Sequence, residues 1–139
     1  MAKATKKILV VEDNDNCREL LGRFIKLLGY EVFEATTGVQ AIERASAVHP
    51  DLIMIDLGLP EMTGDEATAF LKANPATRKI PVIVNTAYAS GPQTKRALDS
   101  GAAEILQKPF PLRILDDVLR KYLSAEDNRA EKRNPSEEN

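Results

Sequence analysis

The sequence predicts one α/β domain, a doubly wound parallel sheet of five strands with helices on both faces. Five short apolar segments alternate with five amphipathic stretches, and the connections between them are short. Alternation of this kind is typical of a parallel sheet whose crossover helices cover both faces. The length of 139 residues, of which 43% are hydrophobic and 29% charged, also suits a single globular core.

The predicted strands are the apolar segments 7–11, 31–35, 51–55, 80–84 and 104–107. The segment 7–11 is continuous and rich in β-branched residues, as expected of a strand covered on both faces. The segment 51–55 is the most apolar, so we place it centrally. The segment 31–35 alternates only partly, which favours a position nearer an edge. Pro81 is tolerated because it stands near the start of its strand.

The helices are predicted from apolar residues that recur at helical spacing between the strands. They cover about 20–28, 41–48, 64–73, 92–100 and 111–123. Gly29, His49 and Gly101 stand just after three of these stretches, where helices typically end. In the third helix we expect Phe70 and Leu71 to face the core.

The predicted domain organisation is an N-terminal extension at 1–5, one globular domain at 6–123 and a polar tail at 124–139. Two alanines are the only apolar residues of the tail. Such a segment cannot bury enough surface to offset the entropy lost on ordering, so we expect it to be disordered. No further domain is expected after residue 123.

Overall charge and composition exclude several classes of protein. The formal net charge is −2, which argues against nucleic acid as the main partner because phosphate binding needs a basic face. No apolar run approaches the length of a membrane span or of a signal peptide. The single cysteine, Cys17, excludes an internal disulfide and suits a reducing compartment. The sequence therefore predicts a cytoplasmic, soluble protein.

Polar residues follow four of the predicted strands at their carboxyl ends. These residues are Glu12 and Asp13 after the first strand, Asp56 after the third, Thr86 after the fourth and Lys108 after the fifth. In a doubly wound sheet the binding crevice lies beyond these strand ends, so we expect the residues to meet there. Three carboxylates in a small space repel one another unless a cation lies among them, and hard oxygen ligands suit Mg²⁺. A bound cation, a lysine and a hydroxyl together form a cradle for a transferring phosphoryl group.

This constellation resembles the receiver domain of two-component response regulators over residues 6 to about 123. The matching motifs are Ile-Leu-Val-Val-Glu12-Asp13-Asn, Asp51-Leu-Ile-Met-Ile-Asp56-Leu-Gly-Leu-Pro60-Glu-Met-Thr-Gly64, Pro81-Val-Ile-Val-Asn-Thr86-Ala and Lys108-Pro109-Phe110. Each motif alone has modest specificity. Four in order, each at the end of a predicted strand, are highly specific. The resemblance implies a flavodoxin-like sheet with the strand order 2-1-3-4-5.

The resemblance also implies a metal site. Asp13, the carboxylate of Asp56 and the backbone carbonyl of Gly58 would bind Mg²⁺, or Mn²⁺ in its place, directly. Glu12 would act through water.

The resemblance implies roles in phosphoryl transfer for three residues. Asp56 would be the phosphoryl acceptor, Lys108 would pair with the phosphoryl oxygens, and Thr86 would move toward them after transfer. The peptide bond between Lys108 and Pro109 is expected to be cis, as it is in this family.

Two positions depart from the family pattern. The fifth strand often carries an aromatic residue that swings inward when the threonine moves, but here that strand contains Ile105. Asn85 stands where a buried strand normally has an apolar residue, and a buried amide without partners costs about 1–3 kcal/mol. Tyr88 follows Thr86 by two residues and is expected either to border the phosphoryl pocket or to be exposed.

The predicted function is that of a stand-alone, single-domain response regulator. A sensor histidine kinase or histidine phosphotransfer domain would donate a phosphoryl group from phosphohistidine to Asp56 in a Mg²⁺-dependent reaction. The protein would then signal by phosphorylation-dependent binding of a downstream protein. It would not be an enzyme that turns over an external substrate, although it would stabilise its own phosphorylation and dephosphorylation. We expect a monomer or weak dimer that neither binds nucleic acid nor inserts into membranes.

Three alternative functions follow from the same residues. Ile105 favours a receiver-like scaffold that binds partners without phosphorylation, although the intact site argues against it. An aspartate-nucleophile phosphatase usually needs a second aspartate two residues after the nucleophile, where this chain has Gly58. A flavin binder of the same topology would need a phosphate-binding loop after the first strand, and Glu12 and Asp13 would repel that phosphate.

Overall fold

A computed structural model describes residues 5–132 of the chain. These residues fall into two compact units, one that ends at residue 109 and one that begins at residue 110. The first unit contains all five strands and four of the helices. The second contains the last helix. All the residues predicted to form the functional site belong to the first unit.

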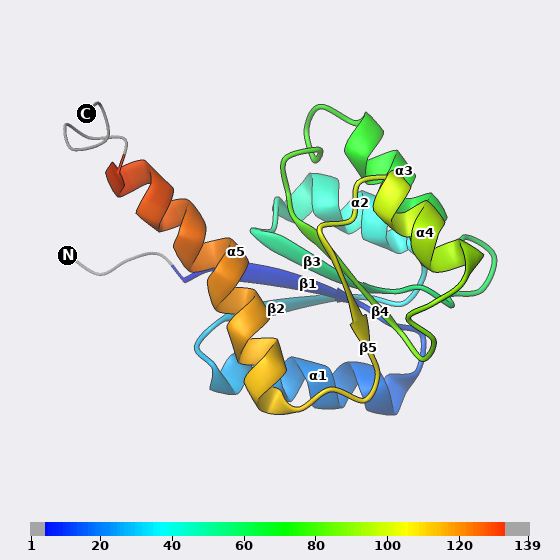
Figure 1. Ribbon diagram of the computed structural model, residues 1–139, viewed down its shortest axis with the longest axis horizontal. Helices are drawn as coiled ribbons and strands as arrows, with labels where there is room; N and C mark the ends of the chain where they lie inside the picture. Colours follow the sequence, from blue (N-terminus) through cyan, green and yellow to red (C-terminus); the bar gives the residue numbers. More distant parts are fainter. Residues whose placement is uncertain (1–4, 133–139) are drawn as a thin grey trace. The chain divides into compact units, whose positions relative to one another are not determined.

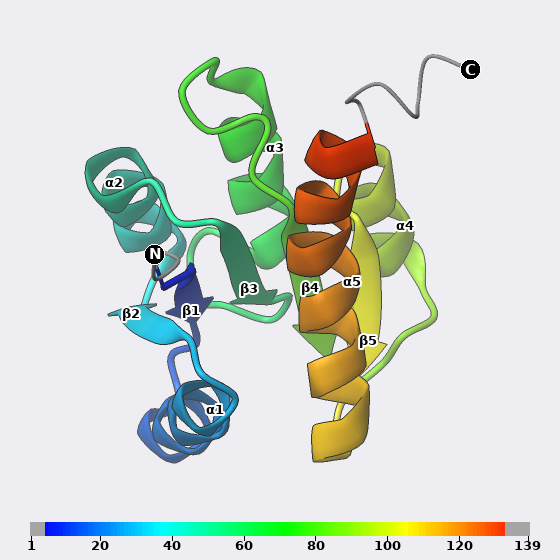
Figure 2. The ribbon, with the colours of Figure 1, turned by 90° about the vertical axis from the view of Figure 1, so that its left-hand side faces the viewer.

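The sheet has five parallel strands in the order β2-β1-β3-β4-β5, as the sequence predicts (Figures 1 and 2). The strands are β1 (Lys7–Val11), β2 (Glu31–Ala35), β3 (Leu52–Asp56), β4 (Val82–Thr86) and β5 (Glu104–Gln107). The central position of β3 and the edge position of β2 are confirmed. Because all strands run the same way, their carboxyl ends lie along one edge of the sheet.

Four helices of the first unit cover both faces of this sheet. They are α1 (Asp15–Leu27), α2 (Gly38–Val48), α3 (Gly64–Ala73) and α4 (Pro92–Asp99). Helices α2, α3 and α4 lie on one side and α1 lies on the other (Figure 2). The α1 helix ends before Gly29, whose φ of 101° needs a residue without a Cβ, and α2 ends at His49 in the left-handed conformation.

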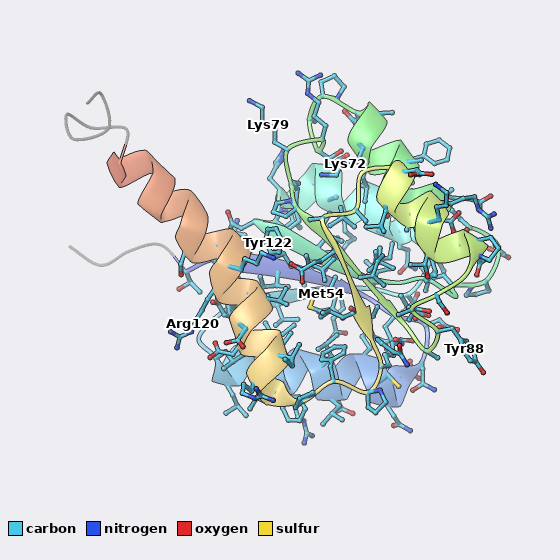
Figure 3. All side chains as sticks on the ribbon, viewed as in Figure 1. Met54, Lys72, Lys79, Tyr88, Arg120 and Tyr122 are labelled. Carbon is cyan, nitrogen blue, oxygen red and sulfur yellow. The ribbon has the colours of Figure 1, made fainter. Side chains whose placement is uncertain are left out.

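The core of the first unit lies on both faces of the sheet. Beneath α2, α3 and α4, strand residues such as Ile53 and Val84 pack against small helix residues such as Ala41. On the other face, Met54 and Ile25 of α1 are fully buried. Figure 3 shows Met54 among the strands. Alternate residues of each strand therefore face different layers, which decides the direction of every polar side chain at the strand ends.

The structure corrects two predictions about the first unit. The fourth strand is Val82–Thr86 and not 80–84, because Pro81 has no N–H to donate and the polar residues Asn85 and Thr86 still pair with their neighbours. Phe70 does not face the core, since 57% of its surface is exposed, whereas Leu71 is buried. Adjacent residues of a helix are about 100° apart, so only one of the two can point inward.

The helix of the second unit is α5 (Leu112–Lys132), which continues beyond the predicted helix end near 123. Residues 124–132 contain neither glycine nor proline, so nothing in this stretch stops the helix, and Pro135 is the first strong breaker. The disorder expected of the tail at 124–139 stays a prediction, and residues 133–139 lie outside the described residues. None of the helices in the described part of the chain is long and apolar enough for a membrane span.

Candidate functional site

The turn after β1 holds Glu12 and Asp13 in place through its own hydrogen bonds. The backbone N–H of Glu12 donates to the carbonyl of Ala35 at 3.1 Å, which continues the pairing of β1 with β2. The Glu12 carboxylate accepts from the N–H of Asn14 at 3.1 Å. Asn14 in turn caps α1, since its Oδ1 accepts from the N–H of Cys17 at 2.9 Å. Glu12 is buried as a result, and Asp13 beside it is exposed.

Arg18 on α1 also supports this turn. Its guanidinium donates to the backbone carbonyl of Glu12 at 2.9 Å and pairs with Asp15 and Glu34. The hydrogen bond and charge of Asp15 raise the pKa of Arg18, partly against the effect of burial. We did not identify Arg18 from the sequence, because its role depends on a contact with Glu34 on the edge strand.

The loop after β3 fixes the position of Asp56. The N–H of Leu57 donates to the carbonyl of Asn85 at 2.8 Å, and the N–H of Gly64 donates to the carbonyl of Leu57 at 2.9 Å. Gly64 lies so close to the strand that a Cβ at this position would be 2.5 Å from the Asp56 carbonyl oxygen. At Gly58, a Cβ would be 3.7 Å from Oδ2 of Asp56, so this glycine borders the carboxylate.

Lys108 forms ion pairs with the carboxylates at the ends of β1 and β3. Its Nζ lies 2.9 Å from Oε1 of Glu12 and 2.9 Å from Oδ1 of Asp56. The side chains of Glu12 and Asp56 are 6% and 13% exposed, and that of Lys108 is 30% exposed. Burial lowers the pKa of Lys108, but the hydrogen bonds and charges of the two carboxylates outweigh this effect and raise the pKa overall. The expected cis bond between Lys108 and Pro109 is confirmed.

The carboxylates of Glu12, Asp13 and Asp56 form a compact cluster. One oxygen from each residue lies within 4.8 Å of the others. This separation and the hard oxygen donors fit a small divalent cation such as Mg²⁺, which binds through one or two carboxylates and keeps several waters. The cluster has more negative charge than Lys108 alone neutralises, so it favours a bound cation electrostatically.

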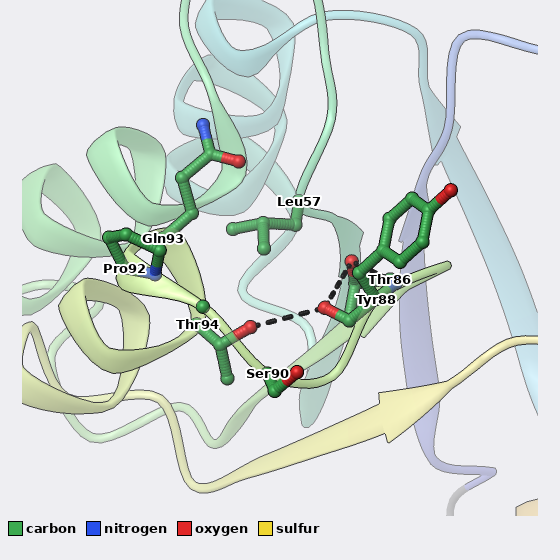
Figure 4. Close-up of a pocket in the computed structure, with 8 residues that line it drawn as sticks. Leu57, Thr86, Tyr88, Ser90, Pro92, Gln93 and Thr94 are labelled. Carbon is green, nitrogen blue, oxygen red and sulfur yellow. Dashed lines mark hydrogen bonds between the residues drawn. The ribbon is translucent and has the colours of Figure 1, made fainter.

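The hydroxyl of Thr86 is engaged by the backbone of the loop after β4. It donates to the carbonyl of Tyr88 and accepts from the N–H of Tyr88, both at 3.1 Å. The same carbonyl accepts from the hydroxyl of Thr94 at 3.3 Å (Figure 4). A small hollow of about 120 Å³ adjoins these groups. It is lined by Leu57, Thr86, Tyr88, Ser90, Gly91, Pro92, Gln93 and Thr94.

The structure brings four of the predicted site residues into one cluster, and the fifth, Thr86, is bonded elsewhere. Glu12, Asp13, Asp56 and Lys108 come together, whereas the Thr86 hydroxyl is occupied by the β4–α4 loop. The expected exposure of Tyr88 is confirmed, because 80% of its surface is exposed (Figure 3). Tyr88 also borders the hollow beside Thr86, and its place at a phosphoryl pocket stays a prediction.

The sequence matches the family model of the response regulator receiver domain over residues 8–120. The polar-differentiation response regulator DivK of Brucella ovis is 35% identical over 119 residues, which cover 86% of this chain and 97% of DivK. DivK of Brucella anthropi is 34% identical over 118 residues, covering 85% of this chain and 96% of its own.

Solved structures agree with these sequence matches. The receiver domain of a sensor histidine kinase from Pseudomonas aeruginosa, solved with a magnesium ion coordinated in its active-site cleft, superposes with a TM-score of 0.82. It is 31% identical, and the alignment covers 87% of this chain and 99% of that domain. The chemotaxis protein CheY4 of Vibrio cholerae superposes with a TM-score of 0.81 at 28% identity, covering 86% of this chain and all of that one.

This chain belongs to the response regulator receiver domain family of two-component systems. It is therefore a signalling domain controlled by phosphorylation and not a typical turnover enzyme. The magnesium ion in the Pseudomonas aeruginosa domain matches the kind of cation that the carboxylate cluster fits.

Proposed function

We propose that Asp56 is the phosphoryl acceptor of this receiver. An oxygen of the Asp56 carboxylate attacks the phosphorus of a phosphohistidine on a partner protein. The new O–P bond forms as the P–N bond breaks, and the imidazole nitrogen leaves with the electron pair and takes up a proton. The product is an acyl phosphate on Asp56. The observation that carries the proposal is the contact of Lys108 with Asp56 at 2.9 Å, at the edge where the strand ends meet.

Lys108 is the residue of this chain that stabilises the transferring group. Its ammonium contacts the carboxylate that reacts, so it lies where negative charge develops on the phosphoryl oxygens. The raised pKa keeps Lys108 charged at neutral pH. Glu12 holds the ammonium from the other side, which limits its movement away from Asp56.

Asp13, Asp56 and the Gly58 carbonyl would hold Mg²⁺ directly, or Mn²⁺ in its place, and Glu12 would act through water. When bound, the cation neutralises charge between the acceptor and the incoming phosphoryl group. The hydrogen bonds from Asn14 and Arg18 hold Glu12 and its turn ready for this role.

Thr86 supplies the conformational response. Its hydroxyl is held by Tyr88, and exchanging these bonds for a bond to a phosphoryl oxygen would release the β4–α4 loop. Ile105 packs against the core beneath α2, α3 and α4, so no aromatic side chain accompanies this exchange in β5. The loop that contains Tyr88 and the start of α4 is therefore the part of the first unit expected to change most.

The proposed partners are a sensor histidine kinase or histidine phosphotransfer domain as donor and a downstream protein as target. The alignment covers nearly the whole length of the DivK relatives, which supports the comparison with these response regulators. We place this signalling in the cytoplasm, where two-component donors present phosphohistidine, and expect a monomer or weak dimer.

A scaffold that binds partners without phosphorylation is the second candidate function. Ile105, a partly buried residue that packs against the core, favours it, because the usual aromatic switch residue is missing from β5. Under this alternative, partner affinity would be the same before and after treatment with a phosphoryl donor.

The test is incubation with acetyl phosphate or phosphoramidate and Mg²⁺, followed by intact-mass measurement. We expect the wild type to gain the mass of one phosphoryl group, and we expect no gain for Asp56→Asn or in excess EDTA. Uptake by Asp56→Asn at the wild-type rate would refute Asp56 as acceptor. Binding of candidate partners, measured with and without the donor, then separates the switch from the scaffold.

A further inference from the structure

Asn85 is a polar residue in the interior of β4 that lacks a hydrogen-bond partner for its side-chain oxygen. The residue is 2% exposed, and its Oδ1 accepts no hydrogen bond from any described residue. A buried amide without partners destabilises the folded state, and an apolar side chain of similar size would avoid this cost.

The sheet register places Asn85 beside the phosphoryl acceptor. Asn85 pairs with Asp56 on β3 and with Leu106 on β5. Side chains of residues in register project from the same face of a sheet. Val84 and Ile55 belong to the core beneath α2, α3 and α4, so their neighbours Asn85 and Asp56 both project toward the opposite face.

Lys108 has to cross β4 to reach Asp56. Its backbone N–H donates to the carbonyl of Thr86 at 2.7 Å, so it continues the ladder of β5 beside β4. It stands two residues after Leu106 and projects from the same face as Asn85. Strands β3 and β5 are separated by β4 and are therefore roughly 9–10 Å apart. Since Lys108 Nζ lies 2.9 Å from Oδ1 of Asp56, the lysine side chain spans the width of β4, the strand that contains Asn85.

The ammonium of Lys108 has a donor to spare. It carries three N–H groups, and the recorded contacts with Glu12 and Asp56 account for two of them. Both of these acceptors change their interactions during the proposed reaction, because an oxygen of Asp56 bonds to phosphorus and Glu12 faces the cation site. Asn85, in register with Asp56 on the neighbouring strand, carries a neutral acceptor that takes no part in these changes.

We propose that Asn85 is a positioning residue for Lys108, its Oδ1 accepting a hydrogen bond from the ammonium once the carboxylates are engaged by a cation and a phosphoryl group. No covalent bond to Asn85 forms or breaks. The neutral amide holds the ammonium near Asp56 without adding negative charge that would repel phosphoryl oxygens. With an apolar residue at this position, the partly exposed lysine would be free to turn toward solvent. This inference rests on the proposed role of Asp56.

The test compares Asn85→Leu with Leu106→Met, an apolar exchange at the position in register with Asn85 on β5. Without metal, Asn85→Leu should raise the melting temperature by a few degrees, because it removes an unpaired buried amide. It should leave the Mg²⁺ dissociation constant from calorimetry within about twofold of wild type and slow phosphoryl uptake from phosphoramidate about tenfold, the effect of one charge-assisted hydrogen bond. Leu106→Met should leave uptake and Mg²⁺ affinity unchanged.

The dependence on Lys108 is tested in the Lys108→Met background, where Asn85→Leu should slow uptake further by less than about twofold. The proposal is overturned if Asn85→Leu slows uptake in the Lys108→Met background as much as it does in the wild type. It is also overturned if Asn85→Leu alone takes up the phosphoryl group at the wild-type rate. A fall in melting temperature for Asn85→Leu also overturns it, because the amide would then be paired and structural.

A crystal structure of the wild type with Mg²⁺ and beryllofluoride, a phosphoryl mimic, supplies a readout that needs no turnover. We expect Oδ1 of Asn85 within about 3.2 Å of Lys108 Nζ, and a separation beyond about 3.5 Å overturns the proposal. Failure of the acceptor role is distinguishable, because the wild type would then take up no phosphoryl group at all, or Asp56→Asn would take it up equally. In that case the role of Asn85 is refuted together with that of Asp56.

Discussion

Replacing Lys108 with methionine should destabilise the metal-free protein and at the same time strengthen Mg²⁺ binding. The substitution keeps the length of the side chain and removes its charge. Glu12 and Asp56 then face each other without the ammonium that lies 2.9 Å from both. A divalent cation can supply the missing positive charge, so the same change that weakens the apo protein favours the metal-bound one.

The size of the effect follows from burial. Removing one partner of a fully buried ion pair costs about 3–5 kcal/mol. The carboxylates of Glu12 and Asp56 are nearly buried, but Lys108 is 30% exposed and water can enter where it stood. We therefore expect a loss of about 2–3 kcal/mol, which corresponds to roughly 10 °C in melting temperature for a chain of this size. If Mg²⁺ binds Lys108→Met about tenfold tighter than wild type, saturating Mg²⁺ reduces the difference in free energy of unfolding between the two proteins by about 1.4 kcal/mol.

The assay is urea unfolding followed by circular dichroism, first with EDTA and then with saturating Mg²⁺. Calorimetric titration measures Mg²⁺ affinity directly. Lys79→Met is the matched control, because it makes the same chemical change at an exposed lysine in the loop before β4 (Figure 3). The control should stay within about 0.5 kcal/mol of wild type.

Two results would contradict this electrostatic account. One is a destabilisation by Lys108→Met no larger than that by Lys79→Met, which would mean that the carboxylates tolerate each other without the ammonium. The other is unchanged or weaker Mg²⁺ binding, which would mean that the lysine does not compete with the cation for the carboxylates.

Three further predictions concern stability. Gly64→Ala should cost about 1–3 kcal/mol and slow phosphoryl uptake, because its Cβ would be 2.5 Å from the Asp56 carbonyl oxygen; wild-type stability in urea would contradict this. Burial lowers the pKa of Lys72, yet its ammonium donates to two backbone carbonyls at 3.0 and 2.6 Å. Lys72→Met should therefore lose about 1–3 kcal/mol in the same assay, and an unchanged midpoint would show that water replaces the ammonium. The pKa of Lys108 is raised above its ordinary value of 10.5 despite burial, so the stability that it contributes is fully present below that pH and is lost as the pH rises through the raised pKa. The stability difference between wild type and Lys108→Met should narrow only above about pH 10.5, and narrowing that begins near neutral pH would contradict the sign of this shift.

The sequence predicts the strands and their order well, because each strand is a local apolar run and parallel sheets follow strict connection rules. It is weaker on the direction of individual side chains. Phe70 and Leu71 are adjacent and both apolar, and only the packing of α3 decides that Leu71 is the buried one. The extension of α5 to Lys132 was missed because polar composition was weighed more heavily than the lack of helix breakers.

The sequence also predicts only part of the candidate site. Glu12, Asp13, Asp56, Thr86 and Lys108 can be found from the sequence, since each follows an apolar strand and strand ends share one edge of the sheet. The hydrogen-bond and ion-pair partners of these residues cannot be found from the sequence. Lys108 is 96 residues from Glu12 and 52 from Asp56, and Arg18 reaches Glu12 only because α1 lies against the end of β1.

By itself, the sequence determined the class of fold, the residues at the strand ends and the acidic character of the site, because these depend on local periodicity and on the chemistry of the side chains. Only the tertiary structure decided that Lys108 bridges two carboxylates and that Thr86 is held by Tyr88. It also decided that Asn85 lies in register with Asp56 while its side-chain oxygen has no hydrogen-bond partner among the described residues. These contacts depend on how strands distant in the sequence align side by side. That alignment is a property of the whole sheet and is not encoded in any one segment.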